Sequence, residues 1–455
     1  MLLKKIKSEG LAHLSYIIGS EGQAAVVDPR RDCQIYLDLA QENNMDIFFI
    51  LETHRNEDYV SGSRELQAMT GAKVLHGDLD FNYGERVWDG QEIRLGMLTL
   101  RAIETPGHTP ESMCYSVVDN EAGPEVVAVF TGDTLLVGEA GRTDLFGPDR
   151  REILSSLQYD SLFDRLLPLG DGVIILPAHG AGSSCGNNIG SREYSTIGLE
   201  RMQNHALMVG GKEEFIDLKL GEVLEKPPYF EQMERLNLEG APLIGSLPRA
   251  FPVPSKEAWA MIETMVLLDL RSPSAYASSH IPGAISLPMD ILPNYGGWVI
   301  PYGPPIILIL DRSSQLDTAI RTLVRIGYDN IAGYISGGME SWHKAALPTS
   351  SFEALSIREL LERPDHGHLF YLDIRAEKEW RVGHANGARH IFVGHLEDRI
   401  DETPVDRETV ILCSSGTRGS LAASLLEKHG RAPINLLGGM AGWKEAGLPI
   451  DRFSR

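Results

Sequence analysis

The second half of the chain contains an internal repeat, which constrains the fold more than any other feature. The segment "LLDLRSPSAYASSHIPGA" (residues 267–284) matches "YLDIRAEKEWRVGHANGA" (371–388), and "YISGGMESWHKAALP" (334–348) matches "NLLGGMAGWKEAGLP" (435–449). A period of about 100 residues is too long for a solenoid unit, so these are two copies of one small domain. In each copy short apolar strands alternate with helical segments, which predicts a parallel sheet covered by helices.

The length of 455 residues predicts about three domains. Prolines between residues 226 and 255 indicate a linker ahead of the repeats. We therefore expect a larger α/β domain over residues 1–235, a first repeat over 236–350 and a second repeat over 351–455. The predicted fold class is multidomain α/β.

The net charge and the cysteine content limit the kinds of partner and the cellular compartment that we expect. With 42 Lys and Arg against 63 Asp and Glu, the net charge of -21 repels nucleic acid and anionic lipid surfaces. Four widely separated cysteines do not form a disulfide framework, and we find no cleavable leader and no apolar run of about 18 residues. We expect a cytoplasmic protein that binds neither nucleic acid nor membrane, and the sequence is compatible with a homo-oligomer.

Four strand-like runs in the first domain each lead into a side chain that can bind a metal ion. These side chains are His54, His108, Asp133 and His179. One such histidine alone is usually a satisfied polar group at a strand end. Because loops at one edge of an α/β domain converge on a rigid scaffold, the four together predict a metal site.

The loop "ETHRNEDYVSG" has the spacing of the H-x-H-x-D-H metal loop of the metallo-β-lactamase superfamily, but Asn56 and Tyr59 replace its second and third histidines. An amide and a phenol are poor metal ligands. The remaining set, His54, His108 and Asp133, leaves about three coordination positions open, which suits Fe(II) that binds both a sulfur atom and O2. Zinc accepts the same ligands, so the ligand types alone do not choose the metal.

Four motifs carry a more specific resemblance over about the first 200 residues. In order, "ETHxxxDxxSG", "TPGHTPES", "TGDTLLVGEAGRTDLFG" and "PAHG" resemble the metallo-β-lactamase-fold persulfide dioxygenases. This resemblance implies a four-layer αββα sandwich, one Fe(II) per chain, and oxidation of a persulfide by O2 to sulfite and thiol. Asp58 and His179 would then orient ligands or water, with Tyr59 beside them. A weak second metal between Asp58, His179 and Asp133 is the alternative.

Two further residues near these motifs keep two interpretations each. Arg142, in "GRTD", either steers an anionic substrate or forms a stabilising ion pair with Asp144. Cys185, six residues past His179, is either an incidental loop cysteine or a residue that carries sulfur or senses persulfide near the iron.

The second repeat contains a loop suited to sulfur chemistry. In "TVILCSSGTRGSLAASLLEKHG", Cys413 ends a strand, and a helix begins near Gly419. Backbone N–H groups of such a turn and the N-terminus of the helix stabilise a thiolate and cradle its persulfide. Arg418 adds a fixed cation to this loop, whose other members are Ser414, Ser415, Gly416 and Thr417.

This loop resembles the rhodanese active loop, and the repeats resemble tandem rhodanese domains through "LDIR", "GHANGA" and "GGMAGW". Phosphatases of related architecture place the arginine six positions after the cysteine, whereas Arg418 is five after Cys413, which favours sulfur transfer. In the first repeat, "IILILDRSSQLDTA" aligns Asp311 with Cys413. A carboxylate cannot form a persulfide, so we expect that repeat to be inactive and to act as a spacer or docking surface.

Nearly the whole chain thus resembles the bacterial persulfide dioxygenase-rhodanese fusions of sulfide detoxification. The resemblance implies a small-molecule persulfide, O2, sulfite and thiosulfate as reactants, with the direction of sulfur transfer left open. One alternative is a zinc-dependent thioester hydrolase of the glyoxalase II type fused to a rhodanese. Another is a rhodanese pair that serves only as an interaction or sensing module.

Overall fold

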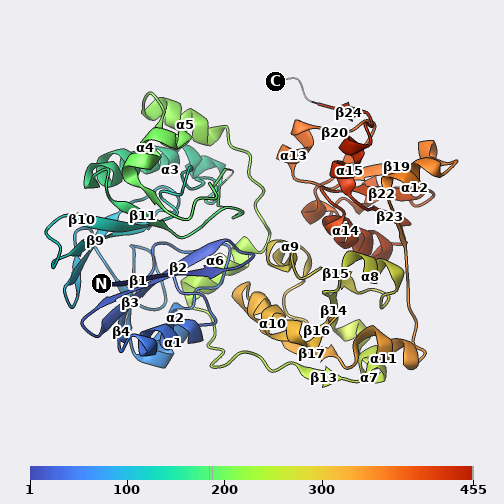
Figure 1. Cartoon of the computed structure of the whole chain (residues 1–455), viewed down its shortest axis with the longest axis horizontal. Coiled ribbons are helices and arrows are strands. Elements are labelled where there is room, and N and C mark those ends of the chain that lie inside the picture. The colour runs from blue at the N-terminus through green and yellow to red at the C-terminus, as the bar shows by residue number, and fades with distance from the viewer. Residues whose placement is uncertain (184, 187, 453–455) are drawn as a thin grey trace. The chain divides into compact units, whose positions relative to one another are not determined.

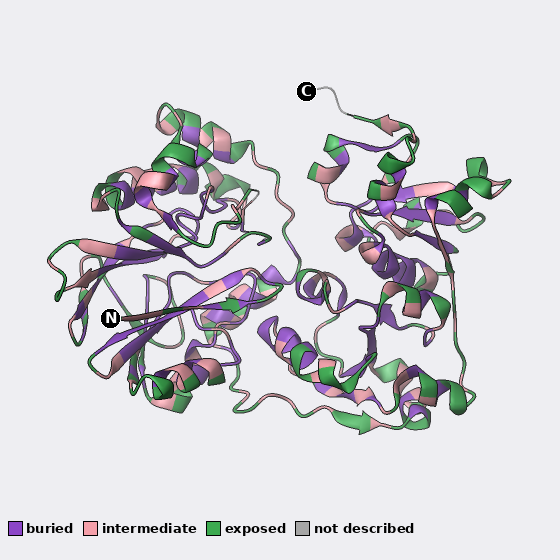
Figure 2. Cartoon of the chain, viewed as in Figure 1, coloured by how far each residue is buried: buried purple, intermediate pink, exposed green. Residues whose placement is uncertain are grey.

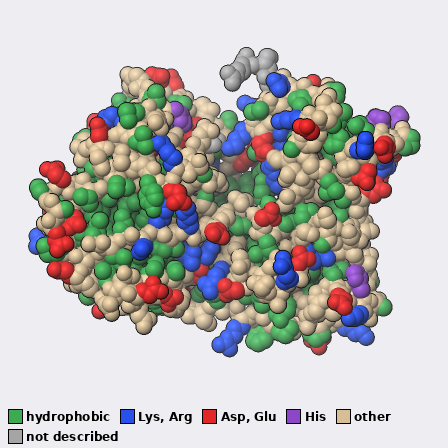
Figure 3. Space-filling model, viewed as in Figure 1, with side chains coloured by type: hydrophobic (Ala, Val, Ile, Leu, Met, Phe, Trp, Pro, Cys, Tyr) green, Lys and Arg blue, Asp and Glu red, His purple; other side chains and the backbone are tan. Residues whose placement is uncertain are grey.

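The computed structural model describes residues 1–183, 185–186 and 188–452. They form two compact units, one of residues 1–246 with 324–327 and the other of residues 247–323 with 328 onwards. Within the described part of the chain, no helix has both the length and the apolar character needed to cross a membrane. Acidic and basic side chains are interspersed on the face drawn in Figure 3.

Two six-stranded sheets form the centre of the first unit (Figure 1). The first sheet has the order β1-β2-β3-β4-β5-β6, with strands Leu2–Ser8, His13–Ser20, Gln23–Val27, Asp46–Leu51, Lys73–His76 and Glu85–Arg86. The second has the order β12-β11-β10-β9-β8-β7, and β7 to β12 span Glu92–Leu95, Leu98–Glu104, Met113–Asp119, Val126–Gly132, Ile174–Pro177 and Ser195–Thr196. Both sheets mix parallel and antiparallel pairs.

Helices cover the outer face of each sheet. The first sheet packs against α1 (Gln34–Glu42) and α2 (Ser63–Thr70). The second packs against the layer that contains α3 (Pro148–Asp160), α4 (Ile197–Gln203) and α5 (Lys212–Leu220), with a π-helical turn at Ser161–Leu166 and short 3-10 turns at Leu167–Leu169 and His205–Leu207. Figure 2 shows buried residues concentrated in the central strands, while these helices also carry exposed residues.

The strands bury both faces because successive side chains point to opposite sides of a sheet. In β3, Val26 packs toward the helices, whereas Val27 packs toward the second sheet. In β4, Ile50 and Leu51 divide in the same way, and Leu51 shares the core between the sheets with Phe130 of β10. The four-layer αββα sandwich expected from the resemblance is confirmed.

The second unit contains two five-stranded sheets, and every strand pair in them is parallel. The first has the order β13-β17-β16-β14-β15, with β13 to β17 at Phe251–Val253, Val266–Asp269, Ile285–Ser286, Ile306–Ile309 and Ile331–Ile335. The second has the order β18-β23-β22-β19-β21, with strands at Glu353–Leu355, Pro433–Leu436, Thr409–Leu412, Phe370–Asp373 and Arg389–His390. The matching strand orders confirm two copies of one parallel α/β domain.

Helices and short elements complete each repeat. The first repeat has α7 to α11 at Ser255–Ala260, Pro273–Ser278, Leu292–Val299, Leu316–Arg325 and Gly338–Lys344, with 3-10 turns at Ile262–Thr264 and Ser313–Gln315. The second has α12 to α15 at Ile357–Glu362, Glu377–Val382, Thr417–Lys428 and Gly439–Glu445, with 3-10 turns at His366–His368, Val393–His395 and Ile400–Glu402. Strands β20 (His384–Ala385) and β24 (Ile450–Asp451) pair separately.

The linker predicted near residues 226–255 is wrong in part. Helix α6 (Phe230–Glu239) buries Phe230 and Met233 within the first unit, which continues to Ser246. A boundary at residue 235 would therefore fall inside a helix. The prolines ahead of α6 mark a turn into that helix, whereas the chain passes to the second unit only before β13.

Candidate metal centre and sulfur-transfer loop

His54, His108 and Asp133 form one buried group, and each follows a strand of the first unit. Nε2 of His54 lies 3.9 Å from Oδ2 of Asp133, and Nε2 of His108 lies 3.6 Å from the same oxygen. A cation bound at about 2.1 Å by each ligand needs ligand atoms about 3 to 4 Å apart. The three side chains therefore fit one metal ion.

Hydrogen bonds orient both imidazoles toward this point. The Nδ1–H of His54 donates to Oγ1 of Thr53 at 2.8 Å, and the Thr53 hydroxyl donates to Asp28 at 2.7 Å. The Nδ1–H of His108 donates to the carbonyl of Arg142 at 2.8 Å. In the neutral imidazole each Nε2 then carries the lone pair, and both Nε2 atoms are buried with no hydrogen-bond partner among the residues that the structure describes. Buried orphan nitrogens of this kind fit metal ligands.

Replacing Thr53 with Val is expected to weaken metal binding by about 10- to 100-fold, because His54 loses the acceptor that fixes its ring. The measurement is competition against a chelator of known affinity. Thr70→Val is the matched control, since the Thr70 hydroxyl donates to the Leu66 carbonyl and accepts from the Ala72 N–H, outside the metal group. Equal metal affinity in the two variants would contradict the role given to Thr53.

His179 lies next to this group and bridges two carboxylates. Its Nδ1 is 2.8 Å from Oδ1 of Asp133, and its Nε2 is 3.0 Å from Oδ2 of Asp58. Burial disfavours a charged imidazole, but the two carboxylates outweigh burial and hold the pKa of His179 well above its usual value. The ring of Tyr59 packs against His13 at a tilt of 33°, with centroids 3.9 Å apart. Asp58 and His179 thus bind each other and orient Asp133.

Glu57 is a site residue that the sequence analysis missed. Its Oε1 lies 3.5 Å from Nε2 of His108 and accepts a hydrogen bond of 3.3 Å from the thiol of Cys185. Burial opposes protonation of His108, but Glu57 and Asp133 outweigh it and raise the pKa of His108 to about 9. The sequence signal for Glu57 was its place beside Asp58 in the loop after β4. A loop sequence does not show which of two neighbouring carboxylates points toward the metal group.

Cys185 is fully buried and belongs to two further groups that could hold a metal ion. One group joins it to Glu57 and Asp133, and the other joins it to Asp58 and His179. The structure therefore brings Cys185 to the metal centre. So many buried carboxylates in one place also favour a cation, because buried charge needs compensation.

Arg142 points away from the metal group. Its guanidinium binds Asp144 through two hydrogen bonds of 2.7 and 2.8 Å and also donates to the Glu225 carbonyl. Its side chain is fully buried. Of the two interpretations from the sequence, the geometry matches the stabilising ion pair with Asp144. Arg142 contacts the metal group through its backbone carbonyl, which accepts the hydrogen bond from His108.

In the second repeat, the Cys413 thiol lies at the centre of a tight loop after β22. Only 1% of Cys413 is exposed, and the Gly416 N–H donates to its sulfur at 2.9 Å. The loop is held by hydrogen bonds from the Met440 N–H to the Cys413 carbonyl and from the Gly438 N–H to the Ser415 carbonyl. Helix α14 begins at Thr417, two residues before the expected start. At least one backbone N–H of this turn, that of Gly416, is therefore directed at the sulfur.

The first repeat has no thiol at the corresponding place, but the residue differs from the prediction. Asp269 pairs with Ile309 as Asp373 pairs with Leu412, so strand register aligns Leu310 with Cys413. The alignment of Asp311 with Cys413 is thus one residue off. In this register Asp311 stands at the place of Ser414. Leu310 also cannot carry sulfur.

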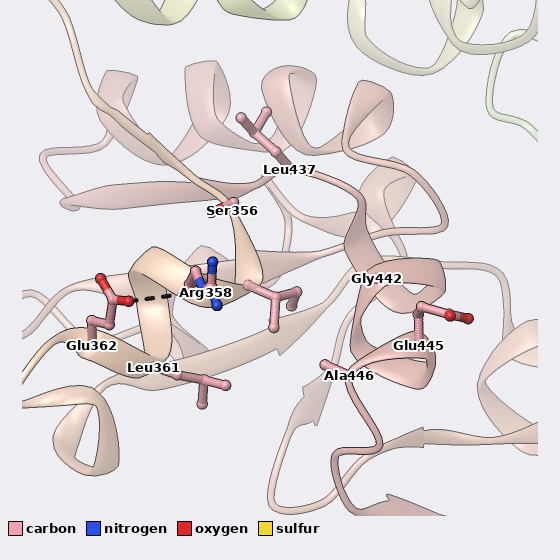
Figure 4. Close-up of a pocket in the computed structure, with 9 residues that line it drawn as sticks. Ser356, Arg358, Leu361, Glu362, Leu437, Gly442, Glu445 and Ala446 are labelled. Atoms are coloured by element: carbon pink, nitrogen blue, oxygen red, sulfur yellow. Dashed lines mark ion pairs between the residues drawn. The ribbon is translucent and has the colours of Figure 1, made fainter.

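A cavity of about 670 Å³ in the second repeat lies between α12 and α15 (Figure 4). It is lined by Ser356, Ile357, Arg358, Leu361, Glu362, Leu437, Gly442, Glu445 and Ala446. None of these lining residues is a thiol or a member of the metal group. The lining of this cavity therefore does not include Cys413 or the metal group.

The chain is similar to known proteins over both units. Residues 9–179 match the model of the metallo-beta-lactamase superfamily, and residues 255–345 and 356–446 match that of the rhodanese-like domain. A solved metallo-beta-lactamase from Staphylococcus aureus subsp. aureus COL is 32% identical, with a TM-score of 0.66, over 74% of this chain and 98% of that one.

Two curated relatives match the first unit. Human mitochondrial persulfide dioxygenase ETHE1 is 26% identical over 236 residues, which are 50% of this chain and 84% of the relative. Hydroxyacylglutathione hydrolase GloC of Haemophilus influenzae is 26% identical over 214 residues, which are 42% of this chain and 90% of the relative.

Proposed function

Because this chain belongs to the metallo-beta-lactamase superfamily and carries two rhodanese-like domains, we propose that it is an enzyme with two linked sulfur reactions. The first domain would oxidise a low-molecular-weight thiol persulfide with O2 to sulfite and thiol. The second rhodanese-like domain would transfer sulfane sulfur through Cys413, and would form thiosulfate from persulfide and sulfite or run in reverse.

The buried group of His54, His108 and Asp133 is the observation that carries this proposal. Two imidazoles and one carboxylate leave about three positions open on an octahedral ion. Asn56 and Tyr59 stand where a two-metal hydrolase needs imidazoles. Similarity to a relative named persulfide dioxygenase supports the same assignment.

One Fe(II) per chain, held by His54, His108 and Asp133, would supply the redox chemistry between O2 and the persulfide. The residues around it would keep these ligands in place. Thr53 holds His54, the Arg142 carbonyl holds His108, and His179 hydrogen-bonds both oxygens of Asp133. Such supporting hydrogen bonds set the orientation and basicity of the ligands.

The remaining residues of the site receive supporting roles in the proposal. Asp58 and His179 orient Asp133 or a water molecule, and Tyr59 fills the space of a lost imidazole and excludes water. Cys185 lines the centre beside Glu57. Arg142 stabilises the fold through Asp144 and does not steer the substrate, because its guanidinium is buried and bonded to Asp144 and the Glu225 carbonyl.

Sulfur transfer would take place in two steps at Cys413. The thiolate attacks the outer sulfur of the persulfide, the sulfur–sulfur bond of the donor breaks, and the donor thiolate leaves. Sulfite then attacks the outer sulfur on Cys413, which forms thiosulfate and returns the Cys413 thiolate. Backbone N–H groups between Ser414 and Thr417 would stabilise the anion in both steps.

The domain limits and the location are part of the same proposal. The metal domain would run to Ser246, and the rhodanese-like domains would meet near residue 350. The four cysteines are free in the structure, which supports a reducing compartment such as the cytoplasm.

Purification without oxygen, metal analysis and oxygen-electrode assays test the proposal. We expect about one iron per chain and O2 uptake that requires a persulfide, with the parent thiol as the control substrate. The similarity to GloC makes a zinc-dependent thioester hydrolase the second candidate. A protein that holds only zinc, hydrolyses thioesters and consumes no O2 would establish that candidate instead.

A further inference from the structure

Arg418 is already bound by the protein at the mouth of the Cys413 loop. Its Nη1 and Nη2 donate to the two carboxylate oxygens of Glu379 at 2.7 and 2.9 Å. Nη2 also donates to the hydroxyl of Ser414, and Nη1 lies 3.4 Å from the hydroxyl of Tyr295. The side chain of Arg418 is 14% exposed. The positive charge of Arg418 is therefore already paired with the Glu379 carboxylate and is not free to bind an anion.

Glu379 ties the same loop at a second point. The Ser414 hydroxyl donates to its Oε1 at 2.7 Å, so one carboxylate binds both the residue after Cys413 and the arginine five positions on. Glu379 itself is held by helix α13, where its Oε2 accepts from the Ala376 N–H at 3.2 Å. A bidentate pair of this kind restricts the guanidinium to one plane.

The inactive repeat is an internal control for this arrangement. The pair Asp373 and Arg375 recurs there as Asp269 and Arg271, with the same hydrogen bonds of 2.9, 3.1 and 2.6 Å. That pair therefore supports the fold.

The loop residues behave differently between the repeats. At the places of Cys413, Arg418 and Glu379, the first repeat has Leu310, Gln315 and Ala275. The thiol, the arginine and the glutamate are absent together, whereas the fold-supporting pair remains. Glu379 is thus present in the repeat that has the thiol and absent from the repeat that lacks it, which associates this residue with the sulfur chemistry.

We propose that Glu379 sets the specificity of the Cys413 site by neutralising Arg418 and holding it against the loop. The inference rests on the proposed sulfurtransferase function. Opposite charges in direct contact cancel at the distance of a bound substrate, so the loop attracts a divalent anion less than a free arginine would. The site then favours a singly charged persulfide over the dianion thiosulfate as sulfur donor.

Replacing Glu379 with Gln tests this specificity. Sulfur transfer to cyanide is measured with thiosulfate and with the persulfide of an uncharged thiol such as 2-mercaptoethanol. In Glu379→Gln we expect kcat/KM for thiosulfate to rise about tenfold relative to that for the persulfide, because a positive charge is exposed. The gain should shrink at high salt. An equal loss with both donors would show that Glu379 only supports the loop and would overturn the proposal.

Glu377→Gln is the matched control. Glu377 lies on the same helix and carries the same charge, but it pairs with Arg381 and His390. The donor preference of this variant should equal that of the wild type. A shift as large as in Glu379→Gln would mean that overall charge, not the contact with Arg418, causes the effect.

Alkylation of Cys413 gives a readout that needs no sulfur transfer. The rates with the anion iodoacetate and the neutral iodoacetamide are compared by mass spectrometry, with Cys413→Ser as the blank. Glu379→Gln should raise the iodoacetate to iodoacetamide ratio about tenfold, and an unchanged ratio would overturn this inference. If Glu379→Gln raises this ratio but Cys413 never accepts sulfur, the result would contradict the sulfurtransferase function and leave the role of Glu379 intact.

Discussion

His108→Ala is expected to remove the bound metal and to lower persulfide-dependent O2 uptake by more than about 100-fold. The variant leaves one imidazole and one carboxylate, and loss of a direct ligand costs more than the 10- to 100-fold of a supporting residue. It also leaves Glu57 buried without the imidazole of His108 beside it. Metal content and oxygen-electrode rates measure the effect.

His205→Ala is the control for this variant. His205 is 42% exposed and pairs with Glu139, outside the metal group. Thermal unfolding of both variants shows whether the domain still folds, and sulfur transfer at Cys413 should continue in both. Full metal content in folded His108→Ala would contradict the proposed ligand set.

Cys413→Ser is expected to lower sulfur transfer by more than about 1,000-fold and to leave O2 uptake unchanged. A serine hydroxyl is a far weaker nucleophile than a thiolate and cannot hold a stable persulfide. The first repeat offers no substitute, because Leu310 stands at the corresponding position. The loop itself should keep its shape, since the Gly416 N–H can donate to the serine oxygen as it does to sulfur.

Single-turnover labelling measures the loss directly. Wild-type protein treated with thiosulfate or a persulfide should gain the mass of one sulfur atom on Cys413. Cys33→Ser is the control, because Cys33 is a buried core cysteine and the variant should label as the wild type does. Sulfur transfer that persists in Cys413→Ser would place the reaction elsewhere, and absence of labelling in the wild type would favour an interaction module.

Much of the fold could be predicted from local pattern. The strands at the starts of the metal loops and of the Cys413 loop are short apolar runs bounded by turn residues, and the structure has strands β4, β8, β10, β11 and β22 there. The repeat was visible because both copies keep residues that their common fold needs, such as the pair of Asp373 and Arg375. The helix α6 was missed because prolines at a helix start also occur in linkers.

The sequence by itself determined which side chains are available for chemistry. A histidine, a carboxylate or a cysteine at the end of a strand lies at one edge of the sheet, because the strand is straight and its loop is short. His54, His108, Asp133 and Cys413 were found in this way. Asn56 and Tyr59 excluded two imidazoles, whatever the fold.

Only the tertiary structure decided which groups face each other. Glu379 and Arg418 are 39 positions apart, and Tyr295, which lies near them, is in the other repeat. Glu57 meets His108 and Cys185 through three separate loops. The pairing of strands places Leu310 at the position of Cys413. These contacts depend on the packing of segments distant in the chain, and local sequence patterns report only the nearest neighbours of each residue.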